Sequence, residues 1–204
     1  MSTNFLDKVY GVSGAYETRA LYDAWSESYE AEIAENGYVT PKRCAEALAA
    51  VLADTSAPIL DFGCGTGLSG LALQQAGFTC FDGVDLSADM LAKAKDKGIY
   101  RTVSVIEPDE TPPGPPGTYR AITAIGVIGS GAAPISVLDQ LCDALTPSGL
   151  LCFSFNDHTL ENPIYEQHVN ALVANGTMRL IQHSYGPHLP ARNINSAIYV
   201  LEKK

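Results

Sequence analysis

Five glycines lie within nineteen residues, "ILDFGCGTGLSGLALQQAG" (59–77), and an acid, Asp61, ends the apolar run before them. A strand that passes through Gly63, Gly65 and Gly67 into a helix presents backbone N–H groups and the positive end of a helix dipole at the carboxyl edge of a sheet. Glycine has no Cβ and tolerates positive φ, so a ligand can touch the main chain there. We therefore expect a polar or anionic part of a ligand to fit closely against this loop.

A second acid, Asp85, ends the next apolar run, where a bound ribose is usually held. The loop also contains G-x-G-x-x-G (65–70), the dinucleotide fingerprint, so an oxidoreductase that binds nicotinamide is an alternative. One observation against this alternative is that a strand ending at Phe62 leaves two extra residues, Gly63 and Cys64, before the first glycine of the fingerprint. The Asp61 carboxylate would also repel a pyrophosphate, whereas it attracts an ammonium or sulfonium group. A P-loop is excluded because no Gly-Lys-Ser/Thr follows the glycines.

The elements that would position these residues alternate along the chain from residue 58. Short β-rich runs are 58–62, 79–85, 101–106, 119–128 and 149–155, and helix-like segments are 67–76, 87–97, 134–145 and 161–175. Such alternation builds an open, mostly parallel sheet with helices on both faces. The last two runs, 177–186 and 193–203, have no helix between them and predict a hairpin joined by "PHLPAR", so one terminal strand is antiparallel. The halves of a dinucleotide-binding domain contain no such hairpin.

Two helices are expected before residue 58. The first has an apolar stripe on one face and stops at Gly37; the stripe consists of Leu21, Tyr22, Trp25, Tyr29 and Ile33. The second begins with Thr40 as N-cap and Pro41 at the first helical position. We assign 1–57 to a helical segment on the lid or substrate side of the domain, and 58–204 to its α/β core. The proline-rich stretch 107–119 predicts a stiff surface connection in place of a crossover helix.

Composition limits the possible partners. The 204 residues suit one domain, and 46% hydrophobic with 18% charged residues is typical of a globular protein. A formal net charge of -10 disfavours binding to a phosphate backbone, so we expect no nucleic-acid partner. The chain shows neither a leader-like start nor eighteen consecutive apolar residues, which predicts a cytoplasmic protein without a membrane anchor. The five cysteines have no C-x-x-C spacing and are expected to be reduced.

The quoted motifs resemble those of a known family. "ILDFGCGTG" (59–67) with "VDLSADML" (84–91) resembles the first motif and the following acidic motif of class I S-adenosylmethionine-dependent methyltransferases. "YRAITAIGVIGSG" and "LCDALTPSGLLCFSFND" resemble the fourth strand, the next helix and the fifth strand of that fold. The resemblance covers residues 20–204. The first and the last segment of this range are similar, more narrowly, to the methyltransferase-like proteins of the Williams-Beuren region group. The resemblance implies a Rossmann-like sandwich, with a mostly parallel seven-stranded sheet and an antiparallel C-terminal strand.

The resemblance also implies a cofactor, S-adenosyl-L-methionine, with S-adenosyl-L-homocysteine as the product. Asp61 would face the methionine ammonium group, directly or through water, and Asp85 would accept from both ribose hydroxyls. Glu107 is the candidate for reading the adenine amino group. The cofactor-binding residues would be Asp61, Gly63, Cys64, Gly65, Asp85, Leu86, Met90, Gly126, Val127, Trp25 and Tyr29, where the two aromatic residues serve either as a lid or as core packing.

Methyl transfer requires alignment more than covalent chemistry, and a general base only where the acceptor loses a proton. Candidate catalytic residues are His158 and Tyr29, together with Asp157 and His188, and the sequence offers no geometry to rank them. No acid or thiol is spaced to complete a zinc site with the histidines, so no metal is expected. The sequence thus predicts a methyltransferase that acts on a small molecule, with a non-catalytic cofactor-binding protein as the alternative and the oligomeric state left open.

Overall fold

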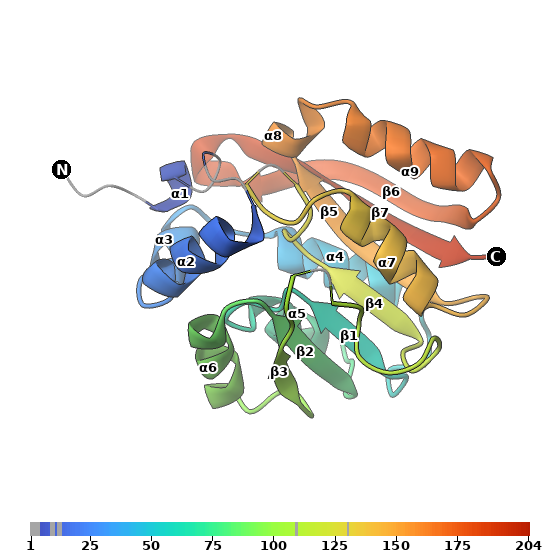
Figure 1. The fold of residues 1–204 in the computed structure, drawn as a ribbon, viewed down its shortest axis with the longest axis horizontal. Coiled ribbons are helices and arrows are strands. Elements are labelled where there is room, and N and C mark those ends of the chain that lie inside the picture. The colour runs from blue at the N-terminus through green and yellow to red at the C-terminus, as the bar shows by residue number, and fades with distance from the viewer. Residues whose placement is uncertain (1–4, 9–10, 12–13, 109, 130) are drawn as a thin grey trace.

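The computed structural model describes residues 5–8, 11, 14–108, 110–129 and 131–204. A seven-stranded sheet with the order β3-β2-β1-β4-β5-β7-β6 runs through the molecule (Figure 1). Its strands are β1 Ile59–Phe62, β2 Phe81–Asp85, β3 Val103–Val105, β4 Ala121–Ala124, β5 Leu150–Asn156, β6 Met178–Leu189 and β7 Ile194–Lys203. β1 to β5 pair in parallel, and β7 is antiparallel to both β5 and β6. The predicted mostly parallel sheet with one antiparallel C-terminal strand is confirmed.

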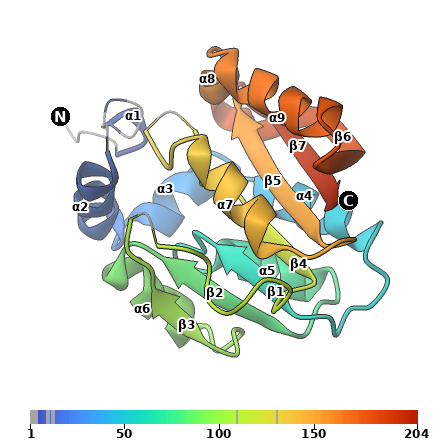
Figure 2. The ribbon, with the colours of Figure 1, turned by 45° about the vertical axis from the view of Figure 1, so that its right-hand side comes forward.

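Helices cover both faces of the sheet. They are α1 Phe5–Lys8, α2 Ala15–Trp25, α3 Tyr29–Glu35, α4 Thr40–Ala49, α5 Leu68–Gln75, α6 Ala88–Asp96, α7 Ser136–Ala144, α8 Asp157–Leu160 and α9 Ile164–Ala174. In Figure 2, α7 and α9 lie in front of the sheet and α4 lies behind β5. None of the described helices has both the length and the apolar character needed to cross a membrane.

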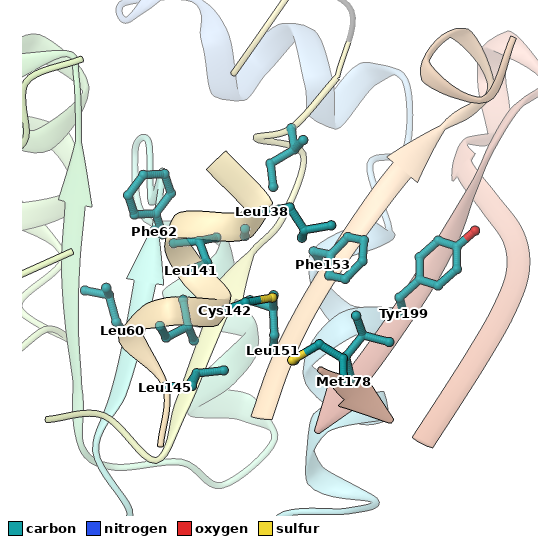
Figure 3. Close-up of a cluster of buried hydrophobic side chains, with 14 of the residues drawn as sticks. Leu60, Phe62, Leu138, Leu141, Cys142, Leu145, Leu151, Phe153, Met178 and Tyr199 are labelled. Carbon is teal, nitrogen blue, oxygen red and sulfur yellow. The ribbon is translucent and has the colours of Figure 1, made fainter. Parts of the chain in front are cut away.

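Alternating side chains of each strand enter two separate cores. On β1, Ile59 packs with α4 and α5, whereas Leu60 packs with α7. Figure 3 shows the second core, in which α7 inserts Leu138, Leu141 and Cys142 against β1 and β5. Burying a side chain such as leucine contributes about 1.5–3 kcal/mol. Because both faces are filled, the carboxyl ends of the parallel strands are held at one edge, where ligands bind in open α/β sheets.

The single helix predicted to end at Gly37 is wrong, because the chain forms two helices there. α2 ends at Trp25 and α3 begins at Tyr29. In the break, Ser26 donates to the Asp23 carbonyl and Ser28 donates to the Glu32 carboxylate. Serine side chains that bond locally compete with helical hydrogen bonds. The apolar stripe nevertheless stays together as one cluster around Trp25.

Two boundaries also differ from prediction. Thr40 does not cap α4: Val39 is the N-cap, and the Thr40 hydroxyl bonds His188 and Ser196 instead. β6 continues through Pro187 to Leu189, and a short 3-10 turn, Pro190–Arg192, makes the connection to β7. Proline is tolerated here because β6 is an edge strand with a register shift at this point. As predicted, no helix forms in the described residues of 107–119.

Candidate functional site

A cavity of about 490 Å³ opens at the edge where the parallel strands end. Its wall is built from the loops after β1 to β4 and from the N-terminal helix α2 with Tyr29 of α3. Predicted residues that line it are Tyr29, Gly63, Cys64, Gly65, Asp85, Leu86, Met90, Gly126, Val127 and Glu107. These residues are far apart in the sequence, and the fold brings them to one wall.

The glycines of the loop serve different needs. A Cβ on Gly63 would lie 2.4 Å from Val127 Cγ2, so that position is glycine because the chain packs closely against the loop after β4. Gly65 has φ +53°, and a Cβ there would meet no atom within 4 Å. Since Gly65 lines the cavity, a side chain at this position would enter the space available to a ligand. Gly65 is therefore the glycine whose missing side chain leaves room for a ligand.

Asp85 ties this loop to the end of β2. Its Oδ2 accepts from the Gly65 N–H at 2.8 Å and its Oδ1 accepts from the Ser87 N–H at 2.9 Å. Burial raises the pKa of Asp85, against the lowering effect of these two N–H groups. Each carboxylate oxygen has further acceptor capacity after one hydrogen bond. Asp85 can therefore hold the loop and accept hydroxyl groups of a ligand at the same time.

Asp61 lies behind the loop and is not among the described residues that line the cavity. The Asp61 side chain is fully buried, and three hydroxyls donate to it: Ser69 at 2.5 Å, Tyr100 at 2.7 Å and Thr123 at 2.8 Å. Burial raises its pKa, while these hydroxyls act in the opposite direction. Ser69 does line the cavity, so Asp61 is separated from a ligand by a hydroxyl rather than facing it directly.

We expect Asp61→Asn to lower the free energy of unfolding by about 1–2 kcal/mol. The Ser69 and Tyr100 hydroxyls both donate to Oδ2 and would lose their charged acceptor, and removal of a carboxylate whose pKa burial raises offsets this loss only in part. The amide would also point a donor at the Ser69 or Tyr100 hydroxyl. Chemical denaturation measures the change. Asp54→Asn is the matched control, since Asp54 accepts twice from Ser56 but is exposed, and its denaturation midpoint should not move. Equal midpoints for both variants would contradict a structural role of Asp61.

The predicted cofactor fits the polar atoms that this cavity leaves unsatisfied. S-adenosylmethionine carries a carboxylate, an ammonium group, a ribose diol and an adenine, all of which need hydrogen-bond partners. Among the described residues, the buried side-chain atoms without a partner are Thr18 Oγ1, Arg19 Nε, Thr66 Oγ1 and Trp25 Nε1. The first three residues line the main cavity, and Thr66 belongs to the glycine loop. Buried polar groups are normally paired, so unpaired polar atoms in three residues of this wall favour a polar ligand here.

A side pocket of about 70 Å³ adjoins the cavity. Tyr22, Tyr29, Tyr38, Gly126 and Ala132 line both spaces. Two residues named from the sequence, Trp25 and His188, line only the side pocket. Tyr22 stacks on Trp25 at a centroid distance of 5.8 Å, and Tyr29 meets it edge-on at 4.7 Å. Trp25 thus lies beside the side pocket rather than against the glycine loop.

The other predicted catalytic residues lie elsewhere. His158 lines neither space among the described residues, and its Nδ1 lies 3.8 Å from the carboxylate of Glu161. Asp157 accepts from the Tyr185 hydroxyl and the Asn195 N–H, which fastens α8 to the terminal hairpin. In the part of the chain that the structure describes, no group of three or more His, Cys, Asp or Glu side chains is arranged to hold a metal ion.

The N-terminal helices α2 and α3 are fastened across the cavity to the elements that follow β2 and β3. In Figure 1 they lie at the same end of the molecule as α6. The side-chain contacts are Arg19 with Glu107, Asp23 with Ser87, Glu27 with Lys93 and Glu30 with Lys97. Exposed ion pairs add little stability, so the aromatic cluster around Trp25 supplies most of the attachment. The Glu107 carboxylate is held by Arg19 at 2.8 Å beside the cavity.

Sequence reasoning missed several wall residues. Thr18, Arg19, Tyr38 and Thr66 line the cavity without belonging to a recognised motif position. Thr66 stands within the quoted glycine loop, so its hydroxyl was a usable signal. Arg19 and Tyr38 reach the site only because α2 and the segment before α4 fold over the sheet edge, which no local pattern indicates.

Comparisons with known proteins identify the family. A family model described as "Methyltransferase domain" matches residues 36–198. Methyltransferase-like protein 27 of Homo sapiens is 32% identical over 148 residues, which is 71% of this chain and 60% of the human protein. The structure of an S-adenosylmethionine-dependent methyltransferase from Thiobacillus denitrificans in complex with S-adenosyl-L-homocysteine has a TM-score of 0.55 at 13% identity, covering 79% of this chain and 91% of that chain. The [4+2]-cyclase SpnF has a TM-score of 0.61 at 18% identity, covering 79% and 80%.

The two solved structures establish only a shared fold, since their identities are low and one of them is described as a cyclase. The family model and the human relative carry the assignment, because they match most of this chain. They favour methyl transfer over the nicotinamide-dependent oxidoreductase that the G-x-G-x-x-G pattern allows. The chain belongs to the methyltransferase domain family.

Proposed function

We propose that this protein transfers the methyl group of S-adenosylmethionine to a small-molecule acceptor. The observation that carries the proposal is the junction of two spaces. A main cavity with a glycine loop and Asp85 adjoins a small aromatic side pocket at Gly126 and Tyr29. The side pocket has room for only part of a small molecule, which favours a compact acceptor over a protein segment or a nucleic acid.

The cofactor is assigned to the main cavity. The backbone from Gly63 to Gly65, with the Thr66 hydroxyl, holds the methionine end, and Asp85 accepts from the ribose hydroxyls. Leu86 and Met90 pack near the adenine. Asp61 acts on the methionine end through Ser69, whose hydroxyl it accepts. The helices α2 and α3, within the predicted segment 1–57, form the wall on the acceptor side.

The bound cofactor supplies a methyl group on a positively charged sulfur, which keeps the electron pair of the broken carbon–sulfur bond when the acceptor's lone pair takes the methyl carbon. The residues of this chain align the two molecules and exclude water, which can account for most of the rate. Burial and neighbouring acidic groups raise the pKa of the Tyr29 phenol well above its usual value. Tyr29 therefore keeps its proton at neutral pH and acts as a hydrogen-bond donor or as packing rather than as a base.

Calorimetric titration with S-adenosylmethionine, S-adenosylhomocysteine and NADH tests the cofactor. We expect the first two to bind with micromolar affinity and NADH not to bind. Incubation of the protein with a small-molecule metabolite extract and a methyl-labelled donor then tests turnover, with heat-treated protein as the control. Binding without transfer of label to any small molecule would favour the non-catalytic alternative, and binding of NADH alone would overturn the proposal.

A further inference from the structure

His188 ends a buried hydrogen-bond relay on the wall of the side pocket. The relay begins at Arg43, whose Nη1 donates to Ser196 Oγ at 3.0 Å. Ser196 Oγ lies 3.1 Å from Thr40 Oγ1, and Thr40 Oγ1 lies 2.8 Å from His188 Nδ1. The side chains of Thr40, Ser196 and His188 are all buried. Residues from α4, β6 and β7 thus meet at one ring of the side pocket.

The Arg43 guanidinium only donates, so Ser196 Oγ accepts from it, and Thr40 is the other partner of the Ser196 hydroxyl. The direction from Ser196 to Thr40 is favoured because, in the opposite direction, the buried Ser196 proton would have no acceptor among the described residues. The Thr40 hydroxyl then donates to His188 Nδ1, which accepts. In the neutral ring, the proton is therefore on Nε2, and among the described residues Nε2 has no hydrogen-bond partner.

The surroundings keep this ring neutral. Burial lowers the pKa of His188 to about 4; Asp157 acts in the opposite direction, and Arg43 and His158 act in the same direction as burial. Tyr38 packs edge-on against the ring at a centroid distance of 5.1 Å. At neutral pH, His188 accordingly presents an N–H donor to the side pocket rather than a lone pair for proton abstraction.

In the described part of the chain, the wall of the side pocket carries no charged side chain: the residues that line it include no Asp, Glu, Lys or Arg. A wall with the His188 N–H donor and no carboxylate suits a ligand atom that accepts hydrogen bonds. An ammonium group, which only donates, would leave this donor unsatisfied.

We propose that the methyl acceptor is a small molecule with a carbonyl or hydroxyl oxygen, and that this oxygen accepts from His188 Nε2–H in the side pocket. His188 is then a positioning residue for the acceptor, and its tautomer is set from Arg43 through Ser196 and Thr40. This inference rests on the proposed function, since it takes the side pocket as the acceptor site.

The tautomer can be measured without knowing the acceptor. In ¹⁵N NMR spectra of the full chain, with His188 assigned by the loss of its signals in His188→Phe, we expect Nε2 protonated and Nδ1 not, and no titration between pH 8 and pH 5. Thr40→Val removes the donor to Nδ1 and should release the tautomer preference. The control is Thr79→Val, which removes a hydroxyl that donates to the Thr55 carbonyl away from both spaces. This substitution should leave the tautomer preference of His188 unchanged. An Nδ1-protonated ring in the wild-type protein would overturn the relay.

The ligand preference is tested with a matched pair of probes, benzamide and benzylammonium, in the presence of S-adenosylhomocysteine. We expect benzamide to shift the His188 signals and to bind about two- to tenfold more weakly to His188→Phe, as expected for one lost hydrogen bond. His183→Phe, on the same strand but lining neither space among the described residues, is the control. Preference for benzylammonium, or no benzamide binding while S-adenosylhomocysteine binds, would overturn this inference alone. Failure of S-adenosylhomocysteine to bind would instead overturn the proposed function.

Discussion

Replacing Gly65 with valine should lower the affinity for S-adenosylhomocysteine about 100-fold, because forcing extra carbon atoms into a close-fitting contact costs about 1–3 kcal/mol. The backbone at Gly65 lines the cavity, and its missing side chain points into open space rather than at other protein atoms. Nothing within the protein therefore prevents a side chain there from occupying the ligand's volume. Calorimetric titration of the variant gives the affinity directly.

The same substitution strains the backbone, so the steric effect needs a control. Gly65 has φ +53°, a conformation that costs a residue with a side chain about 1–2 kcal/mol. Gly176 also has positive φ, +82°, and a Cβ there would meet nothing within 4 Å, but this glycine follows α9 and lines neither space. Gly176→Val should lose comparable stability and keep full affinity. Full affinity in both variants would show that the ligand does not approach the loop at Gly65.

The loop illustrates which inferences a sequence supports. The order of strands and helices follows from local patterns, since each apolar run and each glycine turn is visible within about ten residues. The position of Asp61 at the end of β1 was visible in the same way. Its partner Tyr100, which lies 39 positions later and shields it together with Ser69, was not. The sequence left open whether Asp61 faces a ligand directly or through water, because the hydroxyls around the carboxylate come from segments that no local pattern brings together.

The N-terminal helices show the complementary limit. The apolar stripe correctly grouped Trp25, Tyr29 and Ile33, because Ser26 and Ser28 keep the right-handed helical region across the break and the spacing of about four still places these residues on one side. The periodicity did not reveal the break at Ser26, which arises from side-chain hydrogen bonds that compete with the helix.

Local sequence patterns cannot predict contacts between segments that are distant in the chain. Thr40 was predicted to cap its own helix because threonine before proline is a strong helix-start signal. The hydroxyl bonds His188 instead, 148 positions away. A role for His188 can therefore be argued only once the fold has brought α4 and the terminal hairpin together. His158 was a candidate as well, but its position after β5 says where the backbone is and not where the ring lies.

Substitutions of two aspartates on β2 should affect ligand affinity and protein stability separately. Asp85→Asn should lower the affinity for S-adenosylhomocysteine roughly 30- to 100-fold, or about 2–3 kcal/mol, because a charged acceptor is lost and an amide N–H₂ is directed at the N–H of Gly65 or Ser87. Its effect on stability should be small at neutral pH. Burial raises the pKa of Asp85 in the folded state, so the charged form costs stability as the pH rises above the unfolded value, and removing the charge offsets the lost hydrogen bonds.

Asp82→Asn should give the opposite pattern. Burial alone would raise the pKa of Asp82, but hydrogen bonds from Arg101, Thr102 and Tyr119 outweigh it and lower the pKa, so its contribution is present at neutral pH and is lost as the pH falls. Arg101 is 47% exposed, and solvent screening limits the loss to about 1 kcal/mol. Asp82 lines neither space among the described residues, so affinity should be unchanged. Denaturation and calorimetry on both variants decide the matter: equal losses of affinity would mean that β2 as a whole, rather than the Asp85 carboxylate, determines binding.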